Sequence, residues 1–268
     1  MPVGDQRCQY LSASLRCYCS RDLEKMMADF DAPLEKEVAW RGDGMVARTI
    51  NAVIDLIQSG GLRQGDPLPA ESALAKRFGV SRIVMREANR SLSALGIVEV
   101  GNGRGARVSV PDENVVGLLL DHVVHTRHVT VQQVLDVRRS LEVRAAALAA
   151  LRRSDEEAET ILGHARAMRT AFDRPDDIWQ HDIALHAAIA DASQNPLFSI
   201  MIKAFAPVTR QTWPLGWKNR VHAEREAMIV EHEAIAEAIV NQDIVGARNA
   251  MSAHFDDTVR VLAGAGVT

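Results

Sequence analysis

Residues 68–108 constrain the fold of this 268-residue chain more than any other stretch. A short helical pattern over 71–78 stops at Gly79, and a second helix is expected over 82–95. Glycine readily takes the left-handed conformation that a sharp turn between two helices requires. Ser81 stands where an N-cap of the second helix belongs. The segment therefore predicts two short helices joined by a tight turn.

Another helix is expected before this pair, and a small hairpin after it. Apolar residues at a helical period predict a helix over 45–57, and Gly96 ends the second helix of the pair. Residues 97–100 and 106–110 alternate as two short strands around a glycine-rich tip. This is the layout of a winged helix-turn-helix, which presents its second helix to the major groove of DNA.

Basic side chains are expected on the outer side of this unit. Arg82 and Arg86, at the start of the second helix, can fork onto guanine in the major groove. The glycine-rich tip, which carries Arg104, lets the backbone approach phosphate or the minor groove. Any one of these arginines alone fits a solvated surface charge equally well, but the whole pattern favours DNA binding.

Charge is divided unevenly along the chain. Residues 37–110 carry ten Lys and Arg against seven Asp and Glu, whereas residues 111–268 carry sixteen against twenty-two and all nine histidines. A basic block beside an acidic one fits a phosphate-binding domain joined to a domain that does not touch DNA. We therefore expect a DNA-binding domain over 37–110, a linker over 111–120 and a helical domain over 121–265.

The first 36 residues are expected to form a disordered or extended tail. They hold the three cysteines, Cys8, Cys17 and Cys19, of which the last two lie too close together for a usual zinc knuckle. No apolar run approaches the ~18 residues that span a bilayer. The N-terminus also lacks the pattern of a secretory signal, so we expect a cytosolic protein without a membrane partner.

The helix pair carries a set of family motifs: Leu68-Pro69-Ala70-Glu71, Leu74-Ala75, Phe78-Gly79-Val80-Ser81-Arg82, Arg86-Glu87-Ala88 and Leu95-Gly96. Over about residues 38–110 the chain resembles the DNA-binding domain of GntR-type bacterial transcription regulators. The resemblance implies that DNA is contacted from the positions of Ser72, Ser81, Arg82, Ile83, Arg86 and Gly103. Ser72 replaces the usual Arg and Ile83 the usual Thr, so the operator is expected to differ from the commonest family consensus.

From Val115 onward almost every segment reads as helix. Turn-forming residues at 173–177, 194–196, 207, 214–216 and 241–243 divide it into six or seven helices of an antiparallel bundle. The inward stripe of each helix should be apolar. Five residues that interrupt these stripes are polar: Arg138, Asp182, His186, His232 and His254. The fold class is therefore mainly α, a winged helix-turn-helix followed by an all-α bundle.

Four of these residues are placed to meet. Asp182 and His186 lie one turn apart on one helix. His232 and His254 lie on two later helices that fold back on each other, at heights that differ by only ~3 Å. Each histidine alone fits a hydrogen-bonded core residue, but all four groups are costly to bury without a cation. We expect a divalent metal, with zinc as first choice and nickel or manganese as alternatives.

The same residues belong to a second set of motifs: an acidic residue four before His186, Glu231-His232-x-x-Ile235, Ala253-His254-Phe255, Val137–Glu142 and Asn195-Pro196-Leu197. Over roughly 114–262 the chain resembles the FCD effector domain of the FadR branch of GntR regulators. By this resemblance Asp182, His186, His232 and His254 bind the metal. Arg138 would clamp the carboxylate of an organic or sugar acid, and Asn195 would also bind the effector. Leu185 departs from the usual Phe.

We expect a ligand-responsive transcription regulator that acts as a repressor, and not an enzyme. It would bind a palindromic operator in double-stranded DNA as a homodimer, because one recognition helix covers only a half-site. Two rival interpretations stay open. The adjacent His181 and Asp182 resemble the metal dyad of HD-type phosphohydrolases, although neighbouring helical residues point ~100° apart. The metal could also be purely structural, with Arg138 paired only to Glu142.

Overall fold

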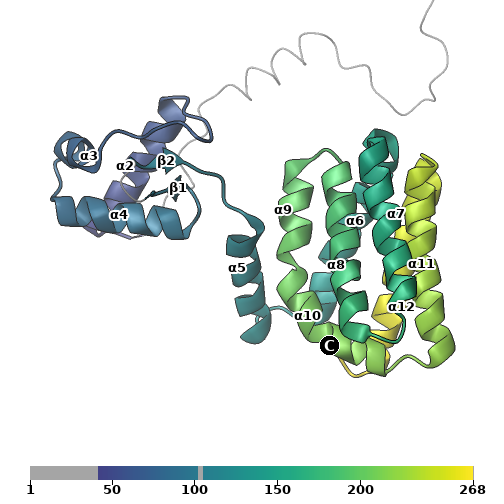
Figure 1. Ribbon diagram of the computed structural model, residues 1–268. Coiled ribbons are helices and arrows are strands. Elements are labelled where there is room, and N and C mark those ends of the chain that lie inside the picture. The colour runs from purple at the N-terminus through teal and green to yellow at the C-terminus, as the bar shows by residue number, and fades with distance from the viewer. Residues whose placement is uncertain (1–41, 102–104, 268) are drawn as a thin grey trace, which may run out of the picture.

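The computed structural model describes residues 42–101 and 105–267, so the expected tail over 1–36 lies outside it, as do Gly103 and Arg104. Within these described residues, the N-terminal unit holds three helices and a hairpin (Figure 1). In chain order these are α2 (Met45–Ser59), α3 (Glu71–Phe78), α4 (Arg82–Ala94), β1 (Val98–Glu99) and β2 (Arg107–Val108). The strands pair antiparallel, with Val98 opposite Val108. They are shorter than expected, although both valines are buried as the alternation predicts.

The turn between α3 and α4 forms as the sequence predicts. Gly79 closes α3 in the left-handed conformation, at φ 68°. The Ser81 hydroxyl caps α4 by accepting a hydrogen bond from the backbone N–H of Val84 at 3.2 Å. Gly96, also at φ 68°, follows the end of α4. Together these features hold the second helix of the pair at a fixed angle over a small apolar core.

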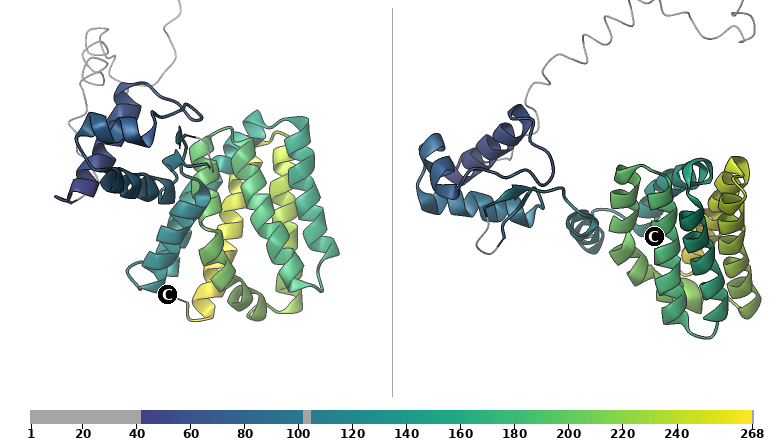
Figure 2. Two further views of the ribbon diagram at one scale, coloured as in Figure 1. Left: turned by 60° about the vertical axis from the view of Figure 1, so that its left-hand side comes forward. Right: turned by 45° about the horizontal axis from the view of Figure 1, so that its top comes forward.

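Residues 111–120, expected to form a linker, lie mostly within helix α5 (Glu113–His125). Asp112 caps this helix, and the helix packs against α9 and α10, as all views show (Figures 1 and 2). Gly117 permits the close packing: a Cβ there would meet the Ala204 carbonyl oxygen at 3.1 Å and Pro207 Cγ at 3.5 Å. Because Asp112 caps the helix and Gly117 lets it pack closely, this segment is a packed helix and not an extended linker.

The remaining helices form the expected antiparallel bundle. They are α6 (Val131–Arg152), α7 (Asp155–Thr170), α8 (Pro175–Ala192), α9 (Pro196–Ala204), α10 (Ala206–Lys218), α11 (His222–Val240) and α12 (Ile244–Gly264). Helix α6 is central and packs against α8, α11 and α12. Its residues 145–150, five alanines and Leu148, are all buried, as a surrounded helix requires.

Two expected breaks fall differently. Pro207 lies in the first turn of α10, where a proline is well tolerated, so the break comes earlier, at Phe205. The expected break over 214–216 is wrong, because α10 continues through Pro214 to Lys218. Among the described residues, none of the helices combines the length and apolar character that crossing a membrane needs.

Candidate metal and effector site

Three histidines from three helices meet inside the bundle. His186 lies on α8, His232 on α11 and His254 on α12, and all three side chains are buried. One potential ligand atom from each lies within 4.8 Å of the other two. Asp182 lies beside them, with its Oδ1 2.9 Å from His232 Nε2 and 3.9 Å from His186 Nε2. The structure thus brings the three predicted histidines into one group and places Asp182 beside two of them.

The hydrogen bonds of His232 leave one ring nitrogen free. Its Nδ1–H donates to the Met228 carbonyl oxygen at 2.7 Å, which fixes the lone pair on Nε2. Nε2 is buried without a hydrogen-bond partner among the described residues, although Asp182 Oδ1 is near. A lone pair facing a carboxylate oxygen is unfavourable unless a cation lies between them. The site therefore fits a metal ion.

His186 is oriented from the opposite side of the cluster. Its Nδ1 donates to Glu142 Oε2, while Glu142 Oε1 accepts from Arg138 Nε at 2.8 Å. Burial by itself would raise the pKa of Glu142, but Arg138 and His186 hold it below its usual value. An ionised carboxylate behind a histidine fixes the ring and leaves its Nε2 for a metal.

His254 completes the cluster as a neutral imidazole. Burial puts the pKa of His254 well below its usual value. Its Nδ1 lies 3.7 Å from Glu231 Oε2 and has no hydrogen-bond partner among the described residues. Burial and the nearby Asp257 raise the pKa of Glu231 to about 7. Neutral imidazole is the form that binds metals.

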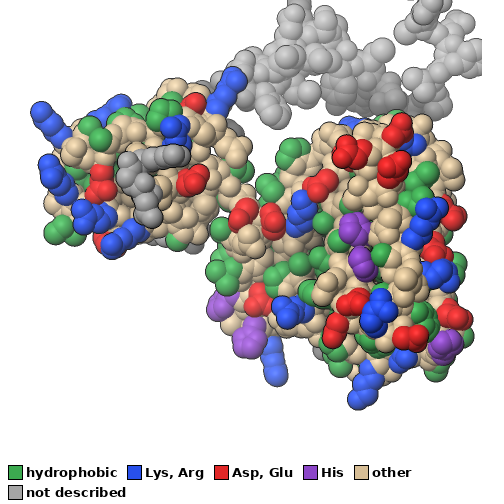
Figure 3. Space-filling model, in the orientation of Figure 1, with side chains coloured by type: hydrophobic (Ala, Val, Ile, Leu, Met, Phe, Trp, Pro, Cys, Tyr) green, Lys and Arg blue, Asp and Glu red, His purple; other side chains and the backbone are tan. Residues whose placement is uncertain are grey.

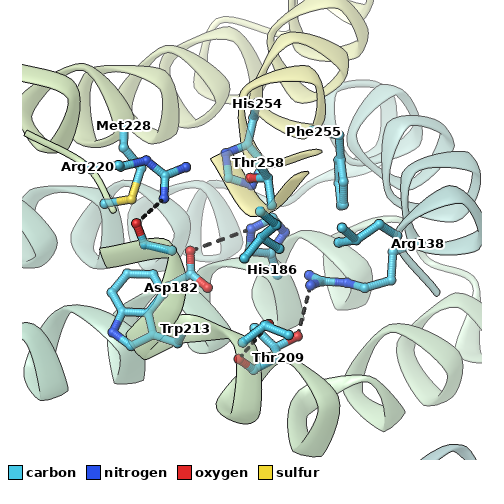
Figure 4. Close-up of a pocket in the computed structure, with 14 residues that line it drawn as sticks. Arg138, Asp182, His186, Thr209, Trp213, Arg220, Met228, His254, Phe255 and Thr258 are labelled. Carbon is cyan, nitrogen blue, oxygen red and sulfur yellow. Dashed lines mark hydrogen bonds and ion pairs between the residues drawn. The ribbon is translucent and has the colours of Figure 1, made fainter. Parts of the chain in front are cut away.

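A small cavity of about 50 Å³ opens beside this cluster (Figure 4). Asp182, His186 and His254 line it together with Arg138. Arg138 is 7% exposed, and its Nη1 donates to the Thr209 hydroxyl at 2.8 Å. Glu142 thus does pair with Arg138, as one rival interpretation expected, yet the arginine also borders the cavity. The arrangement offers an anion both a guanidinium and a candidate metal site.

Four further polar residues line the cavity that the sequence did not single out: Thr209, Thr212, Arg220 and Thr258. Thr258 lies one helical turn after His254, so the helical period of α12 was a usable signal for it. Arg220 is 6% exposed and donates to Asp257 at 2.7 Å and to the Gly216 carbonyl oxygen at 3.1 Å. No periodic pattern distinguishes Arg220 or Thr209, because both lie near helix ends.

Two residues considered from the sequence lie elsewhere. Asn195 does not line the cavity; its side chain caps α9 by accepting a hydrogen bond from the Leu197 N–H at 3.1 Å. An Asn before a Pro-initiated helix is a usual N-cap, which accounts for this position. His181 faces away from Asp182 and toward His164, with their Nδ1 atoms 3.4 Å apart. The adjacent pair therefore does not form a joint metal dyad.

The expected DNA-binding residues that the structure describes are at the surface of the N-terminal unit. These exposed residues are Ser72, Ser81, Arg82, Ile83 and Arg86. Ile83 is 75% exposed, unusual for its type, and Arg86 Nε lies 3.5 Å from Glu71 Oε1. Lys and Arg side chains project around the outer side of this unit, whereas both signs of charge mix over the visible face of the bundle (Figure 3).

Comparison with known proteins gives a match for each half. Residues 46–108 match bacterial regulatory proteins of the gntR family, and residues 133–257 match the FCD domain. The HTH-type transcriptional regulator LutR of Bacillus subtilis (strain 168) is 32% identical over 78% of this chain and 97% of its own length. In Escherichia coli (strain K12), the galactonate operon transcriptional repressor is 28% identical, over 67% of this chain and 80% of its own.

A further relative is the Glc operon transcriptional activator of Escherichia coli (strain K12), 28% identical over 70% of this chain and 76% of its own. Among solved structures, Streptococcus agalactiae GntR shares the fold, with 24% identity, a TM-score of 0.57, and coverage of 80% of this chain and 99% of that one. These relatives are regulators, which sets the phosphohydrolase interpretation aside. The chain belongs to the GntR family of bacterial transcription regulators, with an FCD domain as its C-terminal part.

Proposed function

We propose that an organic acid, bound beside a divalent metal ion in the FCD domain, sets the affinity of this regulator for its operator. One observation carries the proposal: the buried, unpartnered Nε2 of His232 lies beside Asp182 Oδ1, in a cluster of three histidines next to a cavity that Arg138 also borders. Such a cavity combines a cation site with a fixed guanidinium. Both are partners that a carboxylate prefers.

Zinc is the first choice for the metal. Three imidazoles and one carboxylate suit Zn²⁺, and Ni²⁺ or Mn²⁺ are the alternatives. Asp182, His186, His232 and His254 would hold the ion. A bound divalent ion would supply positive charge and open coordination positions facing the cavity. Glu142 would support it indirectly, by holding the His186 ring in place.

The names of the relatives support an acid as effector. One refers to galactonate, a sugar acid, and that protein is a repressor; another is an activator. For this chain we propose that the protein represses transcription and that the acid relieves the repression. A homodimer on a palindromic operator follows from the winged helix-turn-helix, since one recognition helix reads one half-site. Arg82, Arg86 and Ile83 would face that half-site.

A short path joins the cavity to the DNA-binding unit. Arg138 donates to Thr209 in α10, and the Thr209 hydroxyl donates to the Phe205 carbonyl oxygen at 3.1 Å, at the α9–α10 junction. Gly117 of α5 packs against Ala204 at the same junction. Helix α5 follows the hairpin of the DNA-binding unit after four residues. An acid that moves Arg138 would therefore favour one placement of α5 over another.

The test uses the full-length protein purified without chelator. Elemental analysis should find one divalent metal per chain, and small organic acids should weaken the complex with a palindromic operator fragment. Protein treated with EDTA should bind the operator but ignore the acids. A metal-bound protein whose operator affinity no acid alters would leave the metal as a structural element and overturn the effector proposal.

A further inference from the structure

We propose that the effector is a short-chain hydroxy monocarboxylate, and that Thr258 recognises its hydroxyl group. This inference rests on the proposed function and narrows it, since an organic acid could be anything from a two-carbon acid to a sugar acid. Three properties of the cavity carry the inference. They are its size, the small number of unmatched polar groups in its wall, and the positions of Arg138 and Thr258.

Size favours a small ligand. One water molecule needs roughly 10–15 Å³ of cavity volume, so about 50 Å³ corresponds to about four water molecules. An acid of two to four carbons suits such a space. A six-carbon sugar acid is larger than this space, which is lined by Thr209 of α10 and Thr258 of α12.

Most of the polar groups in the wall already have partners. The Thr209 hydroxyl binds Arg138 and Phe205, and the Thr212 hydroxyl donates to the Thr209 carbonyl oxygen at 3.1 Å. The Thr258 hydroxyl, in contrast, takes part in no hydrogen bond among the described residues. Three buried nitrogens of lining residues also lack a hydrogen-bond partner among the described residues: Arg220 Nε, Trp213 Nε1 and His254 Nδ1. The rest of the wall is largely apolar, with Leu135, Met228, Phe255 and Leu262.

This distribution limits the hydroxyl groups that a ligand can bury. A hydroxyl buried without a partner loses its hydrogen bonds to water, and sites discriminate strongly on that basis. The wall can satisfy one or two hydroxyls near Thr258, but not the row of hydroxyls on a sugar acid. Because Glu142 already pairs with Arg138 and Asp257 with Arg220, one carboxylate is also a better match than two.

The two recognition points face the cavity from different sides. In Figure 4, Arg138 lies on the Phe255 side of His186, whereas Arg220 and Met228 lie on the other side, with Thr258 near His254. A carboxylate directed at Arg138 then leaves the hydroxyl-bearing carbon toward Thr258. Thr258 is thus a specificity-determining residue, and Arg138 is the anchor for the charge.

A panel of probes tests the ligand class. Calorimetric titration of the metal-bound full-length protein would compare glycolate, L-lactate and D-lactate with propionate, which matches lactate in carbon number but lacks the hydroxyl, and with D-galactonate. We expect at least one hydroxy acid to bind roughly three- to tenfold more tightly than propionate, the value of one hydrogen bond. Tighter binding of galactonate than of every short acid would overturn the inference while leaving the proposed function intact. Binding of none of them would overturn both.

Two variants test the residue. Thr258→Val removes the hydroxyl at nearly constant shape, and Thr258→Ser keeps it. The preference for the hydroxy acid over propionate should vanish in Thr258→Val and persist in Thr258→Ser. Because the readout is a ratio of two affinities in the same folded protein, a general loss of stability does not imitate it. An unchanged ratio in Thr258→Val would show that another group recognises the hydroxyl.

Discussion

The Glu142 carboxylate accepts a hydrogen bond from Nδ1 of His186 in the centre of the bundle. Its second oxygen accepts from Arg138, so the two oxygens of one buried carboxylate serve two different cationic or ring donors. An amide in the same place would turn its NH₂ group toward one of them. His186, the candidate metal ligand, and Arg138, the candidate anion anchor, therefore share Glu142 as a partner, and loss of Glu142 would affect both.

Glu142→Gln should weaken metal binding. Loss of a carboxylate behind a ligating histidine typically costs 10–100-fold in metal affinity, and we expect about that decrease here. Competition with a chromophoric chelator measures it. Asp136→Asn, an exposed acidic residue on the same helix, is the control and should leave metal affinity unchanged. Equal metal affinity in Glu142→Gln and the wild type would contradict this role.

His232→Ala should remove both the metal and the stability that the metal gives. Metal that binds the native state raises the unfolding temperature, so EDTA should lower that temperature in the wild type but not in the variant. Thermal unfolding with and without EDTA separates this effect from the void that the smaller side chain leaves. His125→Ala, at an exposed position, should respond to EDTA as the wild type does.

Arg138→Lys should abolish the influence of the acid on the operator complex. Lysine keeps a positive charge beside Glu142, whereas alanine would leave that carboxylate without this partner at a cost of about 3–5 kcal/mol. The ammonium group cannot reproduce the fork of the guanidinium. Titration of L-lactate or glycolate into the protein–operator complex is the measurement. Arg139→Lys, next in the chain and partly exposed, is the matched control; an equal response of both variants would refute the clamp.

Arg82→Ala should weaken operator binding by about 1–3 kcal/mol, the usual value of one arginine at a base or phosphate. Fluorescence anisotropy at fixed salt concentration measures the loss. Arg174→Ala removes an exposed arginine of the FCD domain and should have no such effect. A folded Arg82→Ala protein with full operator affinity would remove α4 from its proposed place in the major groove.

Gly117→Ala should alter the coupling between the acid and the operator without touching the cavity. Its Cβ would meet Ala204 O at 3.1 Å and so displace α5 from α9. Substitutions along such a path change coupling by roughly 0.5–2 kcal/mol. Operator affinity measured with and without acid gives the coupling directly. Gly163→Ala on α7 is the control, because its Cβ would meet nothing within 4 Å; identical coupling in both variants would exclude the α5 path.

Local physical rules explain why the helix pair and the inward histidines were predictable. Gly79 and Ser81 have conformational roles that few other residues fill, and a histidine on an apolar stripe is visible from periodicity alone. Thr209 carries no such signal, since threonine is common on either side of a helix. Its importance comes from Arg138, 71 residues earlier in the chain.

At a proline and at an asparagine, the structure shows roles that the local sequence does not indicate. Pro214 was expected to end a helix because it removes a backbone donor, yet α10 runs through it. Packing of α10 on α5, α8 and α12 is a tertiary contribution that the local sequence does not display. Asn195 was assigned to the effector from a motif, whereas its short side chain reaches only the first turn of α9.

Two hydrogen bonds link the side chains of Arg138, Glu142 and His186, and this link affects which ligands the regulator would respond to. Two ligands that share a buried partner change each other's affinity by the same factor, in both directions. On the proposed function, an acid that binds Arg138 would change the hydrogen bond between Arg138 and Glu142, and through Glu142 the position of the His186 ring. A metal bound to His186 would affect Arg138 through the same hydrogen bonds. Transcription would then follow the acid and the supply of metal jointly, so a cell short of metal would not register the acid.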